Sequence, residues 1–311
     1  MAFTSDDLKR NPDFIRALIH LAVNLGDFHR ENPRLCRTLV SHQRWLMGQA
    51  AYMLFLEADP AQPGSGLTSA RLKDFVLRTG CASRNTVLAF VEEMLSYRFL
   101  RYYPEDEGRR SRRLEPADVA RAGMFHWLLA NLAALDQLDG GSRAQTMAAD
   151  RDLADPTHRC AVRTCLENKA WCEPPRRVAM FLWTEAGGLV MDELVSRIDM
   201  SRQIDGRMNI GRVDARVLAE KFMMSRTHLQ RLLKKAASDG CIGWYDARRG
   251  GDMWFSSDFL TEYSAWQAIK FAAIDQAFKA ARTGIEPQFA EEDNSSVPEN
   301  ATSLFQACGL I

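Results

Sequence analysis

The residues best suited to chemistry lie between Ser225 and Ser238, where apolar residues recur at helical spacing. Leu229, Leu232 and Leu233 fall on one side of the expected helix. The opposite side presents five polar residues: Arg226, Thr227, Gln230, Arg231 and Lys234. Arginine, glutamine and threonine can bond to base edges or phosphates, and lysine displaces counterions from a phosphate backbone. This face therefore predicts a contact with double-stranded DNA.

A second stretch of the same kind follows Ser83, which is a suitable N-cap, as Ser225 is for the later helix. Its apolar residues at helical spacing are Val87, Phe90, Val91 and Met94, and its outward residues are Arg84, Asn85, Leu88, Ala89 and Glu92. Arg84 and Asn85 are the candidate DNA contacts. Glu92 would face a phosphate backbone unfavourably, so this reading surface is the weaker one.

A hairpin with a basic tip is predicted after each of these helices. The expected strands and tips are 99–103, 104–110 and 111–114 in the first hairpin, and 241–245, 248–251 and 253–255 in the second. The arginines near the tips are Arg109, Arg110, Arg112, Arg113, Arg248 and Arg249. Guanidinium groups are attracted to the minor groove and to the flanking backbone, so both hairpins are predicted to lie along DNA.

The elements that must position these residues occur twice along the chain. Residues 50–58 match 178–186, residues 83–87 match 225–229, and residues 127–137 match 266–276, in the same order. A repeat of this size is a whole domain. The predicted domains are 1–141 and 142–282, followed by an acidic tail at 283–311 that is expected to be disordered. Residues 189–212 have no counterpart in the first copy.

Further helices are expected around the two units. The ranges are 13–28, 35–57, 68–78 and 116–138 in the first copy, and 176–185, 191–198, 213–222 and 258–281 in the second. Residues 1–12 are expected to be a polar lead-in. The stretch 13–28 is apolar nearly all round, so it is expected to be buried between larger parts.

Each copy has the order helix, tight turn, helix and basic hairpin, and long apolar helices flank it. This order resembles the multiple-antibiotic-resistance regulator (MarR) class of bacterial transcription factors. The resemblance covers most of residues 13–281 as two tandem copies. It implies a mostly α-helical fold with small β-hairpin wings, in which two winged-helix domains and the long helices between them form an internal pseudo-dimer. The implied function is a DNA-binding transcriptional regulator that reads an imperfect palindrome, with a further homodimer left open.

The resemblance also makes a small-molecule effector plausible. Trp45, Trp127, Trp171, Trp183 and Trp266 fall at apolar helix positions, where core packing is the default interpretation. The alternative is a pocket for a small aromatic effector between the long helices and the winged units, near His126 and Trp127. Such an effector would shift the two recognition helices away from a spacing of one DNA turn, roughly 34 Å.

Two other functions compete with regulation. Plasmid replication initiators also carry two winged helices, although the long helices here fit them less well. A scaffold whose winged helices bind protein is favoured by the weak outward face after Ser83 and by the formal net charge of zero. DNA binding should weaken steeply with salt, whereas a scaffold should show no DNA affinity.

Composition is compatible with each of these functions. Five of the 40 acidic residues lie after Thr283, where there is no Lys or Arg, so the remaining body has 40 basic against 35 acidic residues. The chain shows no apolar run of membrane-spanning length and no signal peptide, which predicts a cytoplasmic protein. The motifs G-x-S-x-G, H-E-x-x-H and a phosphate-binding glycine loop are absent, so no enzyme activity and no cofactor are expected.

One cluster of potential ligands needs a separate interpretation. His158, Cys160, Cys165 and Cys172 are close in sequence, but their spacing is not that of a metal site, and buried thiols explain them better. No metal is therefore predicted. A redox-sensing thiol among the three cysteines is the minority interpretation, because it would need a lowered thiol pKa.

Overall fold

The protein is mostly helical, with two small antiparallel sheets, as the sequence predicts. The computed structural model describes residues 2–33, 36, 41–62, 64–109, 111–246 and 251–285. The predicted acidic tail therefore lies almost wholly outside the described residues.

The first half contains six α-helices and one hairpin among these residues. They are α1 (Ser5–Arg10), α2 (Phe14–Glu31), α4 (His42–Leu56), α5 (Ser69–Thr79), α6 (Arg84–Ser96), β1 (Leu100–Tyr102), the 3-10 helix η1 (Pro104–Asp106), β2 (Leu114–Pro116) and α7 (Asp118–Asp139). The second half is more elaborate. It contains α8 (Arg143–Ala149), the 3-10 helix η2 (Arg151–Leu153), α9 (Ala154–Glu167), α10 (Lys169–Cys172), α11 (Arg176–Leu182), α12 (Gly187–Val195), β3 (Gln203–Ile204), β4 (Arg207–Gly211), α13 (Ala215–Lys221), α14 (Arg226–Ser238), β5 (Ile242–Trp244), β6 (Met253–Ser256) and α15 (Ser257–Thr283).

Side-chain caps fix where the helices α5, α6 and α14 begin. Thr68 accepts a hydrogen bond from the backbone N–H of Arg71, and Ser83 and Ser225 do the same three residues before their own partners. These bonds satisfy N–H groups that have no partner within the helix. The N-caps predicted at Ser83 and Ser225 are therefore confirmed.

The two sheets differ in size because the second half adds strands. β1 pairs only with β2, and the chain before α5 adds a single bridge, Thr68 to Arg113. In the second half the strand order is β3-β4-β6-β5, so β4, which comes just before α13, extends the hairpin. Most of segment 189–212 thus forms the end of α12 and two strands. β4, which pairs with β6 in the second half, corresponds to Thr68, which forms the bridge to Arg113 in the first half.

Several predicted boundaries are wrong. Residues 1–12 are not merely a polar lead-in: they contain α1, which a Thr4–Asp7 capping box starts and which buries Leu8 against α15. The returning strand lies at 114–116 rather than 111–114, and Pro116 ends it instead of starting α7. Proline fits there because an edge position needs no N–H donor. The predicted helix 35–57 begins, in the described part, at His42, and the helix predicted at 191–198 lies at 187–195.

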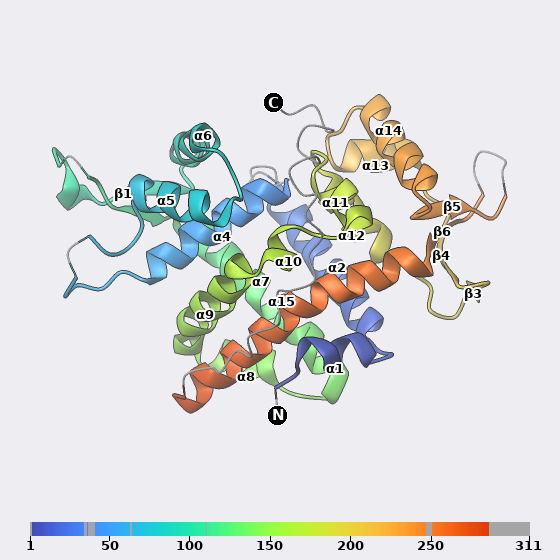
Figure 1. Ribbon diagram of the computed structural model, residues 1–311, viewed down its shortest axis with the longest axis horizontal. Coiled ribbons are helices and arrows are strands. Elements are labelled where there is room, and N and C mark those ends of the chain that lie inside the picture. The colour runs from blue at the N-terminus through green and yellow to red at the C-terminus, as the bar shows by residue number, and fades with distance from the viewer. Residues whose placement is uncertain are drawn as a thin grey trace.

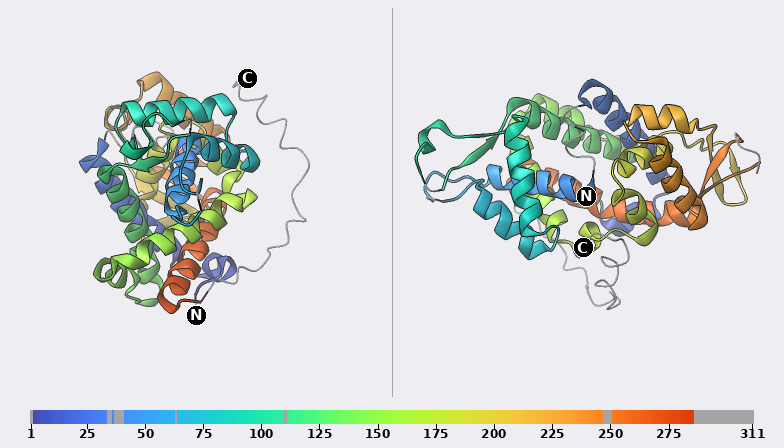
Figure 2. Two further views of the ribbon diagram at one scale, coloured as in Figure 1. Left: turned by 90° about the vertical axis from the view of Figure 1, so that its left-hand side faces the viewer. Right: turned by 90° about the horizontal axis from the view of Figure 1, so that it is seen from above.

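The long helices form the centre of the molecule. α15 packs along α9 and also contacts α1, α2 and α7. Figure 1 shows α5, α6 and the β1–β2 hairpin at one end of the long axis, and α13, α14 and the larger sheet at the other. Both α6 and α14 lie on the upper side in Figure 1, and the left view of Figure 2 shows the teal and orange helices on that side again.

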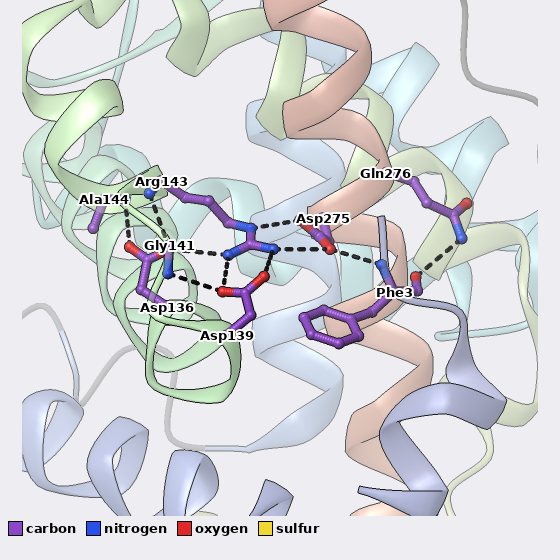
Figure 3. Close-up of polar contacts among 8 residues, drawn as sticks. All are labelled: Phe3, Asp136, Asp139, Gly141, Arg143, Ala144, Asp275 and Gln276. Atoms are coloured by element: carbon purple, nitrogen blue, oxygen red, sulfur yellow. Dashed lines mark hydrogen bonds and ion pairs between the residues drawn. The ribbon is translucent and has the colours of Figure 1, made fainter. Parts of the chain in front are cut away.

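One arginine at the start of α8, Arg143, connects α7 to α15. The guanidinium of Arg143 donates to Asp136 and Asp139 at the end of α7 and, at 2.7 Å, to Asp275 on α15 (Figure 3). Asp275 also accepts a bond of 2.8 Å from the backbone N–H of Phe3. Asp136 and Asp275 stand at matching places of the repeated strings Ala-Ala-Leu-Asp-Gln and Ala-Ala-Ile-Asp-Gln. The N-terminus, the start of α8 and both long helices are therefore joined at one partly buried cluster.

Candidate functional site

The outward face of α14 has the composition that its periodicity predicts. Leu229, Leu232 and Leu233 are buried beneath the helix. The five polar residues named above for this helix are all exposed. Arg226 lies 3.8 Å from Glu220, a contact between two well-exposed side chains that costs the arginine little freedom. The face is therefore basic and open to a partner.

The outward face of α6 is smaller and less basic. Val87, Phe90, Val91 and Met94 are buried, as predicted. Arg84, Asn85, Ala89 and Glu92 are exposed, and Leu88 is half-buried. Arg84 is the one cation among these outward residues. The difference in charge between α6 and α14 that the sequence predicts is thus present on the surface.

The arginines of the first hairpin are largely held within it. Asp106 is buried and accepts bonds of 2.8 Å from the side chain and backbone of Arg113, and Arg109 lies 3.0 Å from it. The hydrogen bonds from Arg113 lower the pKa of Asp106 to about 2. Arg112 stacks on the Tyr102 ring at 3.8 Å. The predicted DNA contacts of this hairpin therefore also hold its own turn together. Arg110 lies outside the described residues.

The second hairpin is described only at its base, because Arg248 and Arg249 lie outside the described residues. Two basic residues that sequence reasoning missed flank this base. Arg202 lies 3.8 Å from Asp252, and exposed Arg207 stacks on the Trp254 ring at 4.6 Å. Only the pairing of β4 with β6 brings them to the hairpin, so no local pattern could have shown this.

His126 and Trp127 line a cavity of about 250 Å³ at the centre of the molecule. Its walls come from both halves, including α2, α4 and α7 from the first and α12 and α15 from the second. His126 stacks on Phe28 with ring centres 4.5 Å apart. The cavity lies where the sequence predicts a pocket for a small aromatic effector.

Tryptophans supply much of the cavity wall. Trp171 and Trp266 are stacked with centroids 4.3 Å apart, and Trp45 and Trp127 lie 5.7 Å apart. These four line the cavity, whereas Trp183 is 36% exposed and is not a core residue. The two interpretations of the tryptophans, core packing and pocket lining, therefore hold together for the buried ones.

Sequence reasoning missed several polar residues of the cavity, among them His42, Asp192, Gln267 and Lys270. Lys270 and Gln267 are buried on α15, and His42 is buried on α4. A signal was available, because Lys270 interrupts the apolar run from Ala268 to Ala273. Lysine is rarely buried without a partner, so a lysine within an apolar helix stretch indicates a polar contact inside the protein.

The histidine and cysteine cluster does not form a metal site. Within the described ranges no three His, Cys, Asp or Glu side chains are placed to hold a metal ion. His158 is buried and hydrogen-bonded to the Gln49 side chain at 2.9 Å, which joins α9 to α4. Cys165 and Cys172 are buried in the core. Burial raises the pKa of Cys165, whereas the pKa of Cys172 is raised first by the neighbouring Cys81 thiol and then by burial. The prediction that these thiols serve packing agrees with their positions.

A different cysteine has the reactive environment. Cys81, in the turn between α5 and α6, has its pKa lowered, first by the neighbouring Cys172 thiol and then by the Thr79 hydroxyl, which donates a hydrogen bond of 3.2 Å to its sulfur. Cys172 belongs to α10, far along the chain from Cys81, so no local pattern could have brought the two thiols together. Lowered pKa and partial exposure are the two properties that make a cysteine nucleophilic.

We expect iodoacetamide at pH 7.5 to alkylate Cys81 before Cys165 and Cys241, because only the thiolate reacts. Peptide mass spectrometry at short reaction times measures the order. Cys172→Ala removes the neighbouring thiol and should slow alkylation of Cys81. Equal rates at Cys81 and the buried Cys165 would contradict this assignment.

Two further observations bear on the class of protein. None of the described helices combines the length and apolar character that a bilayer crossing requires. Comparison with models of protein families, with curated proteins and with solved structures found no match to this chain.

Proposed function

We propose that the protein is a DNA-binding transcriptional regulator built from two tandem winged helix-turn-helix units. The observation that carries the proposal is the pair of capped helices α6 and α14 on one side of the molecule, each followed by an antiparallel hairpin (Figure 1). An α-helix fits the major groove, and a hairpin can reach the flanking backbone. Two such units facing the same way suit two half-sites of one operator.

The two units would contribute unequally. α14 offers Arg226, Gln230 and Arg231 for base or phosphate contacts, whereas α6 offers Arg84 and Asn85 beside Glu92. The second unit is therefore proposed as the dominant reader, on an imperfect palindrome. The central cavity is proposed as an effector site, because a ligand between the halves would change their relative placement.

Charge reversal on α14 tests the DNA assignment. With a sequence chosen by selection from genomic fragments, Arg226→Glu combined with Arg231→Glu should weaken binding about 100-fold or more, because each cation contacts bases or phosphates. Arg159→Glu is the matched control, since Arg159 is exposed on α9 away from this face. Fluorescence anisotropy measures the dissociation constants.

The result that would reject the assignment is unchanged binding by the double variant. Salt provides an independent measurement: affinity should fall steeply between 50 and 200 mM salt, by about 1000-fold if six or more phosphates are contacted.

A protein-binding scaffold is the second candidate, and the first hairpin favours it. Arg109 and Arg113 are held by Asp106, and α6 presents one cation against one acidic residue. A scaffold would show no DNA affinity at any salt concentration, so the same titration separates the two functions.

A further inference from the structure

The central cavity contains one pair of opposite charges. Among the described residues that line it, Asp192 on α12 is the one carboxylate and Lys270 on α15 is the one amine. Each group is near enough to affect the pKa of the other. In the described part of the chain, however, no ion pair of 4.0 Å or less joins them. The two charges therefore face a common space from different helices without neutralising each other.

Both groups are shielded from water, Lys270 almost fully and Asp192 in part. Lys270 is 5% exposed, and burial lowers its pKa to about 7 although Asp192 opposes this. Burial raises the pKa of Asp192 to about 6, although Lys270 opposes that. A buried charge without a close counterion is costly, and such groups on the wall of a cavity mark a candidate binding site, where a ligand can supply the counterions.

We propose that this cavity binds a zwitterionic α-amino acid with an aromatic side chain, its carboxylate on Lys270 and its ammonium on Asp192. The role of this ligand as an effector rests on the proposed function, but its binding does not. The site is formed by both halves of the chain, so an occupied cavity joins them through the ligand.

The rest of the cavity suits the other parts of such a ligand. The stacked rings of Trp171 and Trp266 offer an aromatic wall. The Oε1 atom of Gln267 and the Nε2 atom of His42 are buried with no hydrogen-bond partner. Gln267 Oε1 can accept a bond from the ligand's ammonium. The volume of about 250 Å³ exceeds the roughly 150 Å³ that holds a benzene ring, which leaves room for the charged head group.

Charge separates a zwitterion from its closest relatives. An aromatic acid would gain Lys270 but would bring its carboxylate near Asp192, and an aromatic amine would meet the reverse problem. Only a ligand with both charges leaves neither side chain unpaired. Three compounds that share the phenylethyl group and differ in their charged groups test this directly: L-phenylalanine, 3-phenylpropionate, which lacks the ammonium, and 2-phenylethylamine, which lacks the carboxylate.

Isothermal titration calorimetry on the full chain without DNA gives the affinities. At pH 7 we expect phenylalanine to bind at least 10-fold more tightly than either relative. Asp192→Asn should weaken phenylalanine at least 10-fold and strengthen 3-phenylpropionate, whereas Lys270→Met should weaken phenylalanine and strengthen 2-phenylethylamine. The gains of binding show that each variant is folded. Lys279→Met, on an exposed position of the same helix, should change none of these affinities.

Proton exchange gives a second readout. A bound carboxylate should restore the charge of Lys270, so phenylalanine binding at pH 8 should take up close to one proton, measured in buffers of different ionisation enthalpy. His29, His42 and His126 also line the cavity, and pH 8 lies above the ordinary histidine range. Lys270→Met should abolish the uptake.

The proposal is overturned if none of the three compounds binds, if 3-phenylpropionate binds wild type more tightly than phenylalanine, or if both substitutions leave phenylalanine binding unchanged. Anisotropy with DNA, with and without phenylalanine, then tests the effector role. Binding of phenylalanine with no change in DNA affinity would retain the site and reject that role.

Discussion

Replacing Arg143 with alanine should lower the free energy of unfolding by about 3 kcal/mol, because it leaves the buried carboxylate of Asp275 and the largely buried carboxylate of Asp136 without their counterion. The side chains of Arg143 and Asp136 are each 12% exposed, and that of Asp275 is 3% exposed. The same guanidinium also holds Asp139, whose pKa it lowers. Urea unfolding, followed by tryptophan fluorescence at pH 7, measures the loss.

Two variants make this result specific. Arg143→Lys keeps the charge but cannot reach three carboxylates with one planar group, so its loss should be intermediate. Arg282→Ala, at an exposed position near the end of α15, should change stability by no more than about 0.5 kcal/mol. A loss below 1 kcal/mol for Arg143→Ala would mean that water, rather than the protein, solvates these carboxylates.

Acidification from pH 7 to pH 5 should cost about 2 kcal/mol of stability for each of two buried histidines, His42 and His158. Burial lowers the pKa of His42 to about 4 and that of His158 to about 3. Both are neutral in the folded protein, whereas the unfolded chain takes up protons below about pH 6.5. Their stabilisation is therefore full above pH 6.5 and is lost as the pH falls toward the folded values.

Asp192 acts in the opposite direction. Its pKa is raised to about 6, so its protonation returns about 1 kcal/mol as the pH falls through that value. The difference between variants isolates the histidine effect. We expect His158→Gln, whose amide can still bond to Gln49, to reduce the loss of stability between pH 7 and pH 5 by about 2 kcal/mol. Parallel pH profiles for wild type and variant, from urea unfolding at each pH, would contradict the assignment.

Local patterns predicted the elements that local physics decides. Ser83 and Ser225 cap their helices, and the inward residues of α6 and α14 are buried, because spacing along one helix fixes its faces. The position of β2 was missed by several residues, since its register depends on Leu100 meeting Pro116 across the hairpin. The sequence of one strand alone does not determine which residue of the partner strand it pairs with.

The candidate sites show the same limit. The exposed residues of α14 could be predicted, but their DNA contacts stay a prediction. His126 and Trp127 were correctly placed beside a cavity, while its charges were missed. Lys270 and Asp192 are 78 positions apart, on helices that only tertiary packing brings to one space. For the same reason, Cys81 was not recognised as the partner of Cys172.

The position of Arg143 has a consequence for how the chain can be divided. In an assembly of two identical subunits every residue occurs twice, so a single cation cannot serve one aspartate from each. Here Arg143, at the start of α8, donates to Asp136 and Asp275 together. Cutting the gene between the halves would leave one product without the cation for its own aspartate. One cation shared between two aspartates is a stoichiometry that identical subunits cannot reproduce, and it makes the two halves of this chain depend on each other.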